Sequence, residues 1–275
     1  MGANEPSKRR DRGSLSFLLS VALPNLLVVG LCMLALWLVS LAIKNASIVD
    51  PFWGTGFVII AWVTFLRVGE ASARALLLLA MVTVWGLRLS LYLLIRNLPH
   101  GEDFRYRAMR TSIGARFWWV SFFSVFSLQG MLMWLISSPL QLTIADKTRH
   151  IGVIEIVATF LWLVGFSFEA IGDAQLRAFK KDPASKDRVM DQGLWRYTRH
   201  PNYFGESLMW WGYGIYALAT PGAGWALLAP AAMTFLLLRV SGVTLLEKSI
   251  GDRRPGYREY VQRTSAFVPM PPKKM

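Results

Sequence analysis

Long apolar runs, separated by short charged segments, dominate this sequence of 275 residues. Hydrophobic residues make up 54% of the chain, and they gather in runs of about 20 residues, enough for a helix to cross a bilayer. We therefore predict an all-α, polytopic membrane protein with about seven transmembrane helices. The spans are expected at residues 15–43, 48–66, 75–95, 117–137, 151–171, 203–220 and 225–246.

We predict one transmembrane domain over residues 1–275, because no low-complexity linker interrupts the chain. Three polar segments flank or connect its spans. They are a basic N-terminal segment (1–14), a cytoplasmic loop (172–202) and a cytoplasmic C-terminal cap (247–275).

The net charge of +13 would suggest nucleic acid as the partner of a soluble protein. Between apolar spans, the same charge indicates positive-inside topology and contact with anionic lipid, so we expect no nucleic-acid partner. Lys and Arg concentrate on one side of the predicted spans. This side is expected to be cytoplasmic, with the N-terminus outside and the C-terminus inside.

Cysteine and histidine usage argues against disulfide and metal chemistry. The single cysteine, Cys32, lies inside an apolar run, which excludes a disulfide framework. His100, His150 and His200 are scattered and form no HExxH pattern. We therefore expect no metal site.

Five ionisable residues lie inside or at the edge of the predicted spans. A charge at mid-membrane costs about 2.5–3.5 kcal/mol, so it normally faces a partner or a wet cavity. Structural ion pairs, such as one between Arg88 and Glu169, would explain individual cases. A polar cavity open to the cytoplasm explains the whole set better. The five residues are Arg88, Glu169, Asp173, Glu206 and Arg239.

The end of the fifth span carries acids followed by bases at helical spacing. Glu169, Asp173, Arg177 and Lys180 share one face if the helix continues beyond the bilayer. Acids near the membrane could hold ribose hydroxyls, and the cations outside could hold phosphates. A solvated, salt-laced helix is the alternative. "KKDPASKDR" adds further cations, but no glycine-rich loop follows a strand, so a Rossmann site is not expected.

Two segments in the N-terminal half also combine acids with neighbours that could do chemistry. In "SIVDPFWG", Asp50 precedes Pro51, a pattern that suits a helix cap or a reactive acid at the mouth of a span. "GEDFRYRAMR" is expected to be a polar loop that either is simply exposed or closes over a site. Its candidate residues are Glu102, Asp103, Arg105 and Tyr106.

Near the C-terminus, Tyr257 and Tyr260 alternate with arginines that include Arg253 and Arg254. A membrane-surface helix and a cap that stacks its tyrosines on a planar ring are both compatible with this pattern.

Five motifs in order carry a family resemblance. They are "SIVDPFWG", "WGLRLSLYLLIRN" with "GEDFRYRAMR", "DAQLRAFKKDP", "GLWRYTRHPNYFGE" with "WWGYGIYAL", and "EKSIGDRRPGYREYVQRTSAFVP". Over residues 45–270 the chain resembles the steroid 5α-reductase family, most of all its bacterial DUF1295 branch. The RHPxYxG element alone is also similar to isoprenylcysteine methyltransferase relatives and sterol reductases. The resemblance implies a seven-span enzyme that uses NADPH to reduce a conjugated C=C bond.

The resemblance also implies roles for individual residues. Asp50 would match the family's catalytic glutamate and would act in its protonated form, while Trp85 stands where the family has a catalytic tyrosine. Trp53 or Tyr106 would then supply the missing donor. The implied NADPH-binding residues are Arg88, Arg105, Glu169, Asp173, Lys180, Arg188, Tyr197, Arg199, His200, Asn202, Tyr203, Glu206, Arg253, Arg254 and Tyr257.

The expected function is therefore NADPH-dependent reduction of a steroid-like, membrane-dissolved enone by a monomer in a bacterial inner membrane. A methyltransferase that uses S-adenosylmethionine is one alternative, but that cofactor has no phosphate for the basic run from Lys180 to Arg188. A lipid-binding protein without catalysis is the other, and it would leave Asn202 and Glu206 dispensable.

Overall fold

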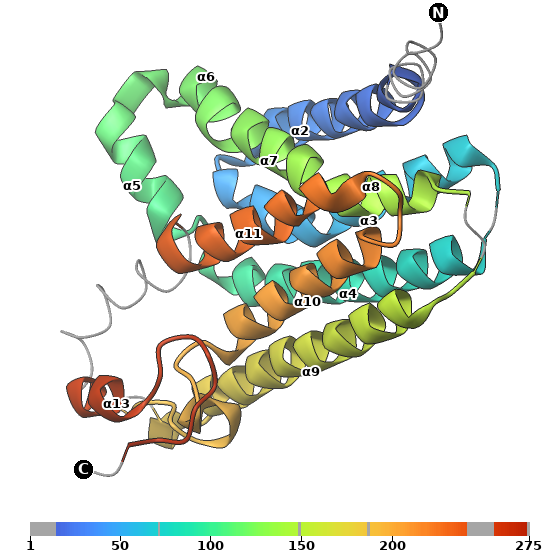
Figure 1. The fold of residues 1–275 in the computed structure, drawn as a ribbon. Coiled ribbons are helices and arrows are strands. Elements are labelled where there is room, and N and C mark those ends of the chain that lie inside the picture. Colours follow the sequence, from blue (N-terminus) through green and yellow to red (C-terminus); the bar gives the residue numbers. More distant parts are fainter. Residues whose placement is uncertain (1–14, 71, 148–149, 186–187, 241–255, 274–275) are drawn as a thin grey trace, which may run out of the picture. The chain divides into compact units, whose positions relative to one another are not determined.

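The computed structural model describes residues 15–70, 72–147, 150–185, 188–240 and 256–273, and most of them lie in helices (Figure 1). Extended pairing in the described residues is limited to one isolated parallel bridge, between Thr198 and Ser265. The predicted all-α class is confirmed.

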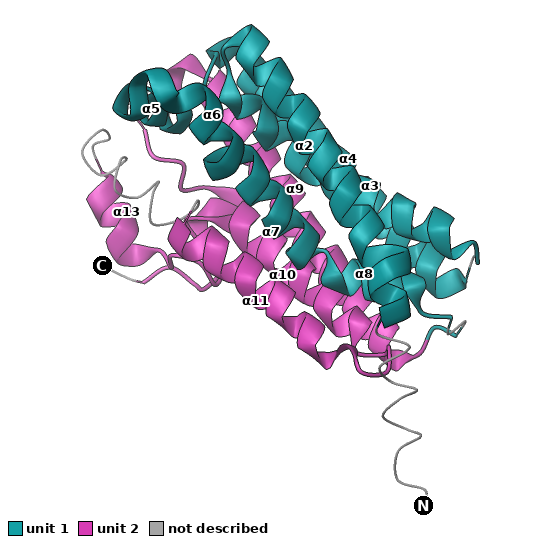
Figure 2. Cartoon of the chain, turned by 90° about the horizontal axis from the view of Figure 1, so that it is seen from above, with its two compact units in different colours: residues 1–151 teal, residues 152–275 magenta. Residues whose placement is uncertain are grey.

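The chain forms two compact units, residues 1–151 and residues 152–275 (Figure 2). One domain over the whole chain stays a prediction, since two compact units can belong to one domain. Unit 1 contains α2 (Leu23–Ile43), α3 (Val49–Val68), α4 (Ala73–Asn97), α5 (Phe104–Ile113), α6 (Phe117–Ser121), α7 (Leu128–Ile136) and α8 (Ser138–Ala145). Unit 2 contains α9 (Val153–Lys181), α10 (Pro201–Ala217), α11 (Leu228–Phe235) and α13 (Tyr257–Arg263).

Six helices in the described part of the chain are long and apolar enough to cross a membrane. They span Leu15–Ile43, Ala46–Val68, Ala73–His100, Phe104–Ile136, Val153–Lys181 and Ala223–Val240. The remaining predicted span corresponds to α10, whose 17 residues lie at the lower limit for crossing a bilayer. The prediction of about seven membrane helices is thus close. Residues 241–246 of the last predicted span lie outside the described residues.

Glycines allow close helix packing inside each unit. In unit 2, α9 and α10 run side by side (Figure 1), and a Cβ on Gly205 would lie 2.4 Å from the backbone oxygen of Gly165. In unit 1, a Cβ on Gly54 of α3 would lie 2.3 Å from the backbone oxygen of Gly86 on α4. Only glycine fits at these positions, so the two helix pairs are held at backbone contact.

We expect Gly205→Ala to destabilise unit 2, because the added methyl group meets backbone atoms that cannot move aside. Overpacking of this kind typically costs about 1–3 kcal/mol. Thermal unfolding in detergent should show a Tm several degrees below that of the wild type. Gly30→Ala is the matched control, because a Cβ there has nothing within 4 Å and alanine favours helix. Equal Tm values for the two variants would contradict the packing argument.

The prediction of a loop around residue 104 is wrong, and one of the two alternatives for Asp50 is excluded. The polar segment after Asp103 is a helix, not a loop: α5 begins at Phe104, and the Asp103 carboxylate caps it by accepting from the Arg105 N–H at 2.9 Å. Asp50 is not a helix cap, because α3 begins at Val49 and Asp50 lies within its first turn. Its carboxylate therefore does not cap its own helix and can bind side chains of other helices.

Candidate functional site

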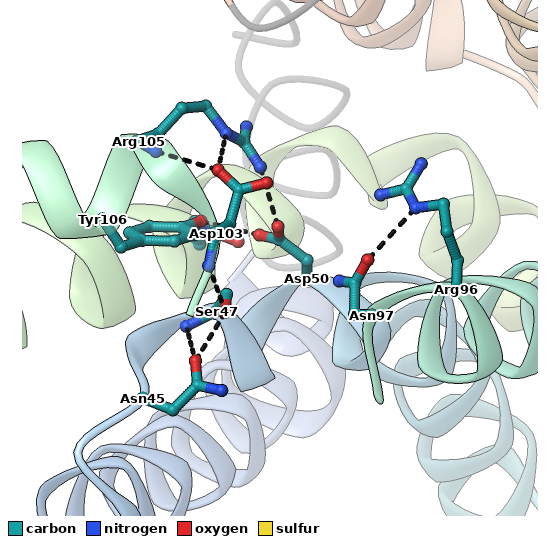
Figure 3. A network of polar contacts seen from close by, with 9 residues as sticks. Asn45, Ser47, Asp50, Arg96, Asn97, Asp103, Arg105 and Tyr106 are labelled. Atoms are coloured by element: carbon teal, nitrogen blue, oxygen red, sulfur yellow. Dashed lines mark hydrogen bonds and ion pairs between the residues drawn. The ribbon is translucent and has the colours of Figure 1, made fainter. Parts of the chain in front are cut away.

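Asp50 forms the centre of a polar cluster in unit 1 (Figure 3). The Tyr106 hydroxyl donates to its Oδ1 at 2.6 Å, and the Arg105 guanidinium donates to its Oδ2 at 2.8 Å. Both carboxylate oxygens thus have partners from α5, and one partner is a cation. Such contacts are typical of an ionised carboxylate. The role as a protonated donor that the resemblance implies for Asp50 stays a prediction beside these contacts.

Glu102 holds the start of α5 against the start of α3. Its carboxylate accepts from the Ala46 N–H at 2.8 Å and from the Arg110 guanidinium at 2.7 and 3.0 Å. The Asp103 N–H adds a hydrogen bond to Ser47 Oγ at 3.1 Å. Burial acts to raise the pKa of Glu102, but the hydrogen bonds from Arg110 and Ala46 outweigh it and lower the pKa. These contacts fix the segment that carries Arg105 and Tyr106.

The two tryptophans of this region pack against Phe57. Trp53 meets Phe57 edge-on, with ring centroids 5.3 Å apart. Trp85, which stands where the family has its tyrosine, is fully buried and lies 5.8 Å from the Phe57 ring. Of the two candidate donors, the structure brings Tyr106 to Asp50.

Two polar side chains near Asp50 escaped the sequence analysis. Gln129 of α7 donates from Nε2 to the Tyr106 hydroxyl oxygen at 3.2 Å. Asn97, at the end of α4, accepts from Arg96 Nε at 3.1 Å (Figure 3), and its buried side-chain nitrogen has no hydrogen-bond partner. The signal available in the sequence was a neutral amide within, or at the end of, an apolar run. Such residues also occur as structural contacts, so the signal is weak.

Unit 2 contains a second polar cluster, where α9 meets the start of α10. Glu169 and Asp173, one turn apart on α9, are both buried. Asn202 of α10 donates from Nδ2 to Asp173 Oδ1 at 3.1 Å. Because a carboxylate oxygen only accepts, this contact fixes the amide orientation. The Asn202 Oδ1 atom is then buried and has no hydrogen-bond partner.

The segment before α10 is anchored to α9 by tryptophan and glutamine side chains. The Trp195 indole donates to the Gly172 carbonyl at 3.0 Å, and the Leu194 N–H donates to Gln175 Oε1 at 3.0 Å. Gly193 has a φ of +59°, which other residues rarely adopt. The helix α9 runs without a break to Lys181, past residue 171 where the predicted span ends, and carries these anchors.

Arg199 holds the C-terminal segment of unit 2. Its guanidinium donates to the backbone carbonyls of Thr264, at 2.5 Å, and Val261, at 3.1 Å, which belong to the end of α13 and the residue after it. The Tyr260 hydroxyl donates to the Trp195 carbonyl at 2.5 Å, and burial raises the pKa of this tyrosine. The predicted cofactor role of Arg199 stays a prediction beside this observed structural one.

The remaining predicted cofactor residues occupy varied settings. His200 and Tyr203 stack with ring centroids 5.6 Å apart, and the Arg88 guanidinium lies over the Tyr92 ring. Glu206 and Tyr257 are buried, whereas Tyr197, Lys180 and Arg188 are exposed. Arg253 and Arg254 lie outside the described residues. The described part of the chain holds no cluster of three or more His, Cys, Asp or Glu residues suited to a metal.

A family model described as "Protein of unknown function (DUF1295)" matches residues 36–264. The chain belongs to this family. The DUF1295 family is steroid 5α-reductase-like, as the resemblance indicated.

The DUF1295 chain is 26% identical to "Uncharacterized protein C594.04c" of Schizosaccharomyces pombe over 265 residues, which cover 85% of this chain and 75% of the relative. Over 66 residues it is 33% identical to "3-oxo-5-alpha-steroid 4-dehydrogenase 1" of Homo sapiens. This alignment covers 24% of this chain and 26% of the human protein. A macaque protein of the same name matches equally, and no solved structure gives a significant match.

The unit 2 cluster of this DUF1295 chain fits the nicotinamide end of a dinucleotide. The unpartnered Asn202 Oδ1 can accept from a carboxamide N–H₂ group. The buried carboxylates of Glu169 and Asp173 are suited to ribose hydroxyls, and the exposed Lys180 and Arg188 to phosphates.

Proposed function

We propose that this DUF1295 protein is a membrane-embedded, NADPH-dependent reductase of conjugated C=C bonds in lipid-like enones, with 3-oxo-Δ4-steroids as the model substrates. The hydrogen bond between Tyr106 and Asp50 carries the proposal. A phenolic donor, backed by the Asp50 carboxyl group and the Arg105 guanidinium, thus lies among the apolar helices of unit 1. The partial similarity to a steroid 4-dehydrogenase supports the same chemistry.

Enone reduction requires a donor at the substrate carbonyl. Addition of hydride to the β-carbon moves the C=C electrons towards the oxygen, which becomes an enolate. A positioned hydrogen-bond donor stabilises this charge best where water is excluded. Tyr106 is 6% exposed and supplies such a hydroxyl. When its hydrogen turns from Asp50 to the substrate, Arg105 still neutralises the Asp50 carboxylate.

Residues of unit 2 are proposed to hold the cofactor. Asn202 would accept from the carboxamide, and Asp173 would orient the Asn202 amide. Lys180, near the end of α9, and Arg188 would face phosphates. When bound, NADPH would supply the hydride. S-adenosylmethionine has neither a carboxamide nor a phosphate, so it would offer no counterpart for these proposed contacts.

The six apolar helices fit an integral membrane protein. We further propose a monomer in a bacterial inner membrane, with the C-terminal cap in the cytoplasm. A substrate dissolved in the bilayer could then enter laterally from the hydrocarbon, which suits a steroid-like molecule.

The proposed function is tested by cofactor identification and turnover. Protein purified in detergent without added nucleotide is expected to release NADPH or its oxidised form, identified by mass spectrometry. The same protein should oxidise NADPH when progesterone or testosterone is added and should yield a product two mass units heavier than the enone. Recovery of S-adenosylmethionine, or NADPH oxidation without reduction of the steroid, would contradict the proposal.

A further inference from the structure

Gln129 is a polar side chain that the proposed reaction does not yet use. It lies in α7, within a helical stretch from Phe104 to Ile136 that is long and apolar enough to span a membrane. Its amide nitrogen donates to the Tyr106 hydroxyl oxygen at 3.2 Å. The contact is part-buried, and a polar contact inside an apolar helical unit calls for a functional or structural reason.

The local helix geometry aims Gln129 at Tyr106. A π-helical segment, Phe122–Ser127, directly precedes α7. Such segments are rare in proteins, and those that occur often lie at functional sites. The next residue, Gly130, packs against α2, where an added Cβ would lie 3.0 Å from Met33 Cγ. Consecutive helical residues point about 100° apart. The contact of Gly130 with α2 therefore fixes the direction of Gln129.

The Tyr106 hydroxyl can accept a hydrogen bond from Gln129 while it donates its own hydrogen to another group. A tyrosine hydroxyl has one hydrogen to donate and two lone pairs that accept. The hydrogen points to Asp50 at 2.6 Å, and the Gln129 amide occupies one lone pair. The Gln129 contact is independent of where the hydroxyl hydrogen points. It persists when the hydrogen turns from Asp50 to a substrate oxygen.

We infer that Gln129 is a positioning residue for the proposed reduction and acts through Tyr106. As the substrate oxygen becomes an enolate, its hydrogen bond with Tyr106 tightens and the phenolic oxygen gains negative charge. The Gln129 N–H stabilises that charge, so its hydrogen bond is stronger in the transition state than in the ground state. Such a contact raises kcat and has little effect on KM. The inference rests on the proposed function.

The test compares Gln129→Met, which has no donor, with Gln129→Glu, which donates only when protonated. Gln129→Met should lower kcat about 3- to 10-fold at unchanged KM, the effect of one neutral hydrogen bond. Gln129→Glu should be slow at neutral pH, because the ionised side chain accepts the Tyr106 hydrogen. It should recover relative to Gln129→Met as the pH falls. Leu128→Met on the same helix is the control, since Leu128 is 52% exposed.

A ¹⁹F NMR measurement, which needs no turnover, distinguishes failure of the Gln129 inference from failure of the proposed function. In protein labelled with 3-fluorotyrosine, the ¹⁹F signal that Tyr106→Phe removes should shift in Gln129→Met and stay in place in Leu128→Met. An active wild type with a normal Gln129→Met kcat would overturn the inference alone, as would parallel pH profiles for the two Gln129 variants. A wild type that reduces no enone would overturn the proposed function and the catalytic role of Gln129 with it. In that case a shifted ¹⁹F signal would still establish the contact.

Discussion

Tyr106→Phe is expected to lower kcat for enone reduction about 100- to 1,000-fold, the usual effect of losing one donor to a developing oxyanion. The substitution removes only the hydroxyl, which donates to Asp50 at 2.6 Å in the resting protein. The ring can keep its place beneath the Arg105 guanidinium, 5.4 Å from the ring centroid. NADPH binding and thermal stability should therefore change little. Steady-state NADPH oxidation with progesterone measures the loss.

Trp53→Phe is the matched control, because Trp53 is the other donor that the sequence offered. Its indole packs on Phe57, so the variant should keep most of the activity. A small loss in Tyr106→Phe together with a large loss in Trp53→Phe would reverse the assignment.

The helical class was predictable because it depends on local sequence. A run of about 20 apolar residues can satisfy its backbone in a bilayer only as a helix or as part of a closed barrel, whatever lies elsewhere in the chain. The short α5 was missed for the same reason: it is polar and only 10 residues long, and no apolar run marks it. Its start depends on Asp103 as a cap and on Glu102 reaching back to Ala46.

Individual residues of the candidate site could be predicted from the sequence, but the contacts between them could not. Asp50 stood out as an acid beside an apolar run, yet its partners Arg105 and Tyr106 are 55 and 56 positions away. Pairings over such separations arise from tertiary packing, which residue types alone do not encode. Arg199 is a second case. The resemblance suggested that it lines the cofactor pocket, and nothing in the sequence indicated that its guanidinium donates to backbone carbonyls more than 60 residues on.

Asn202→Leu is expected to weaken NADPH binding about 10- to 100-fold without unfolding the protein. The reason is the unpartnered Oδ1 atom of Asn202, which is buried beside Asp173 and is proposed to accept from the nicotinamide carboxamide. Leucine has a similar volume and can fill the position, but it neither accepts this hydrogen bond nor donates to Asp173. Losing a partner of a buried polar group typically costs about 1–3 kcal/mol. Fluorescence titration with NADPH measures the change, and thermal unfolding checks the fold.

A cofactor analogue identifies the atom responsible. In the acetylpyridine analogue of NADPH, an acetyl group replaces the carboxamide and offers no N–H to Asn202. Wild-type protein should therefore bind the analogue more weakly than NADPH, whereas Asn202→Leu should bind both with similar affinity. This comparison is a double-mutant cycle between one protein atom and one ligand group, so it isolates their contact from any general loosening of α10. If the variant discriminated between the two cofactors as strongly as wild type, Asn202 would not be the carboxamide acceptor, and its buried oxygen would need another partner.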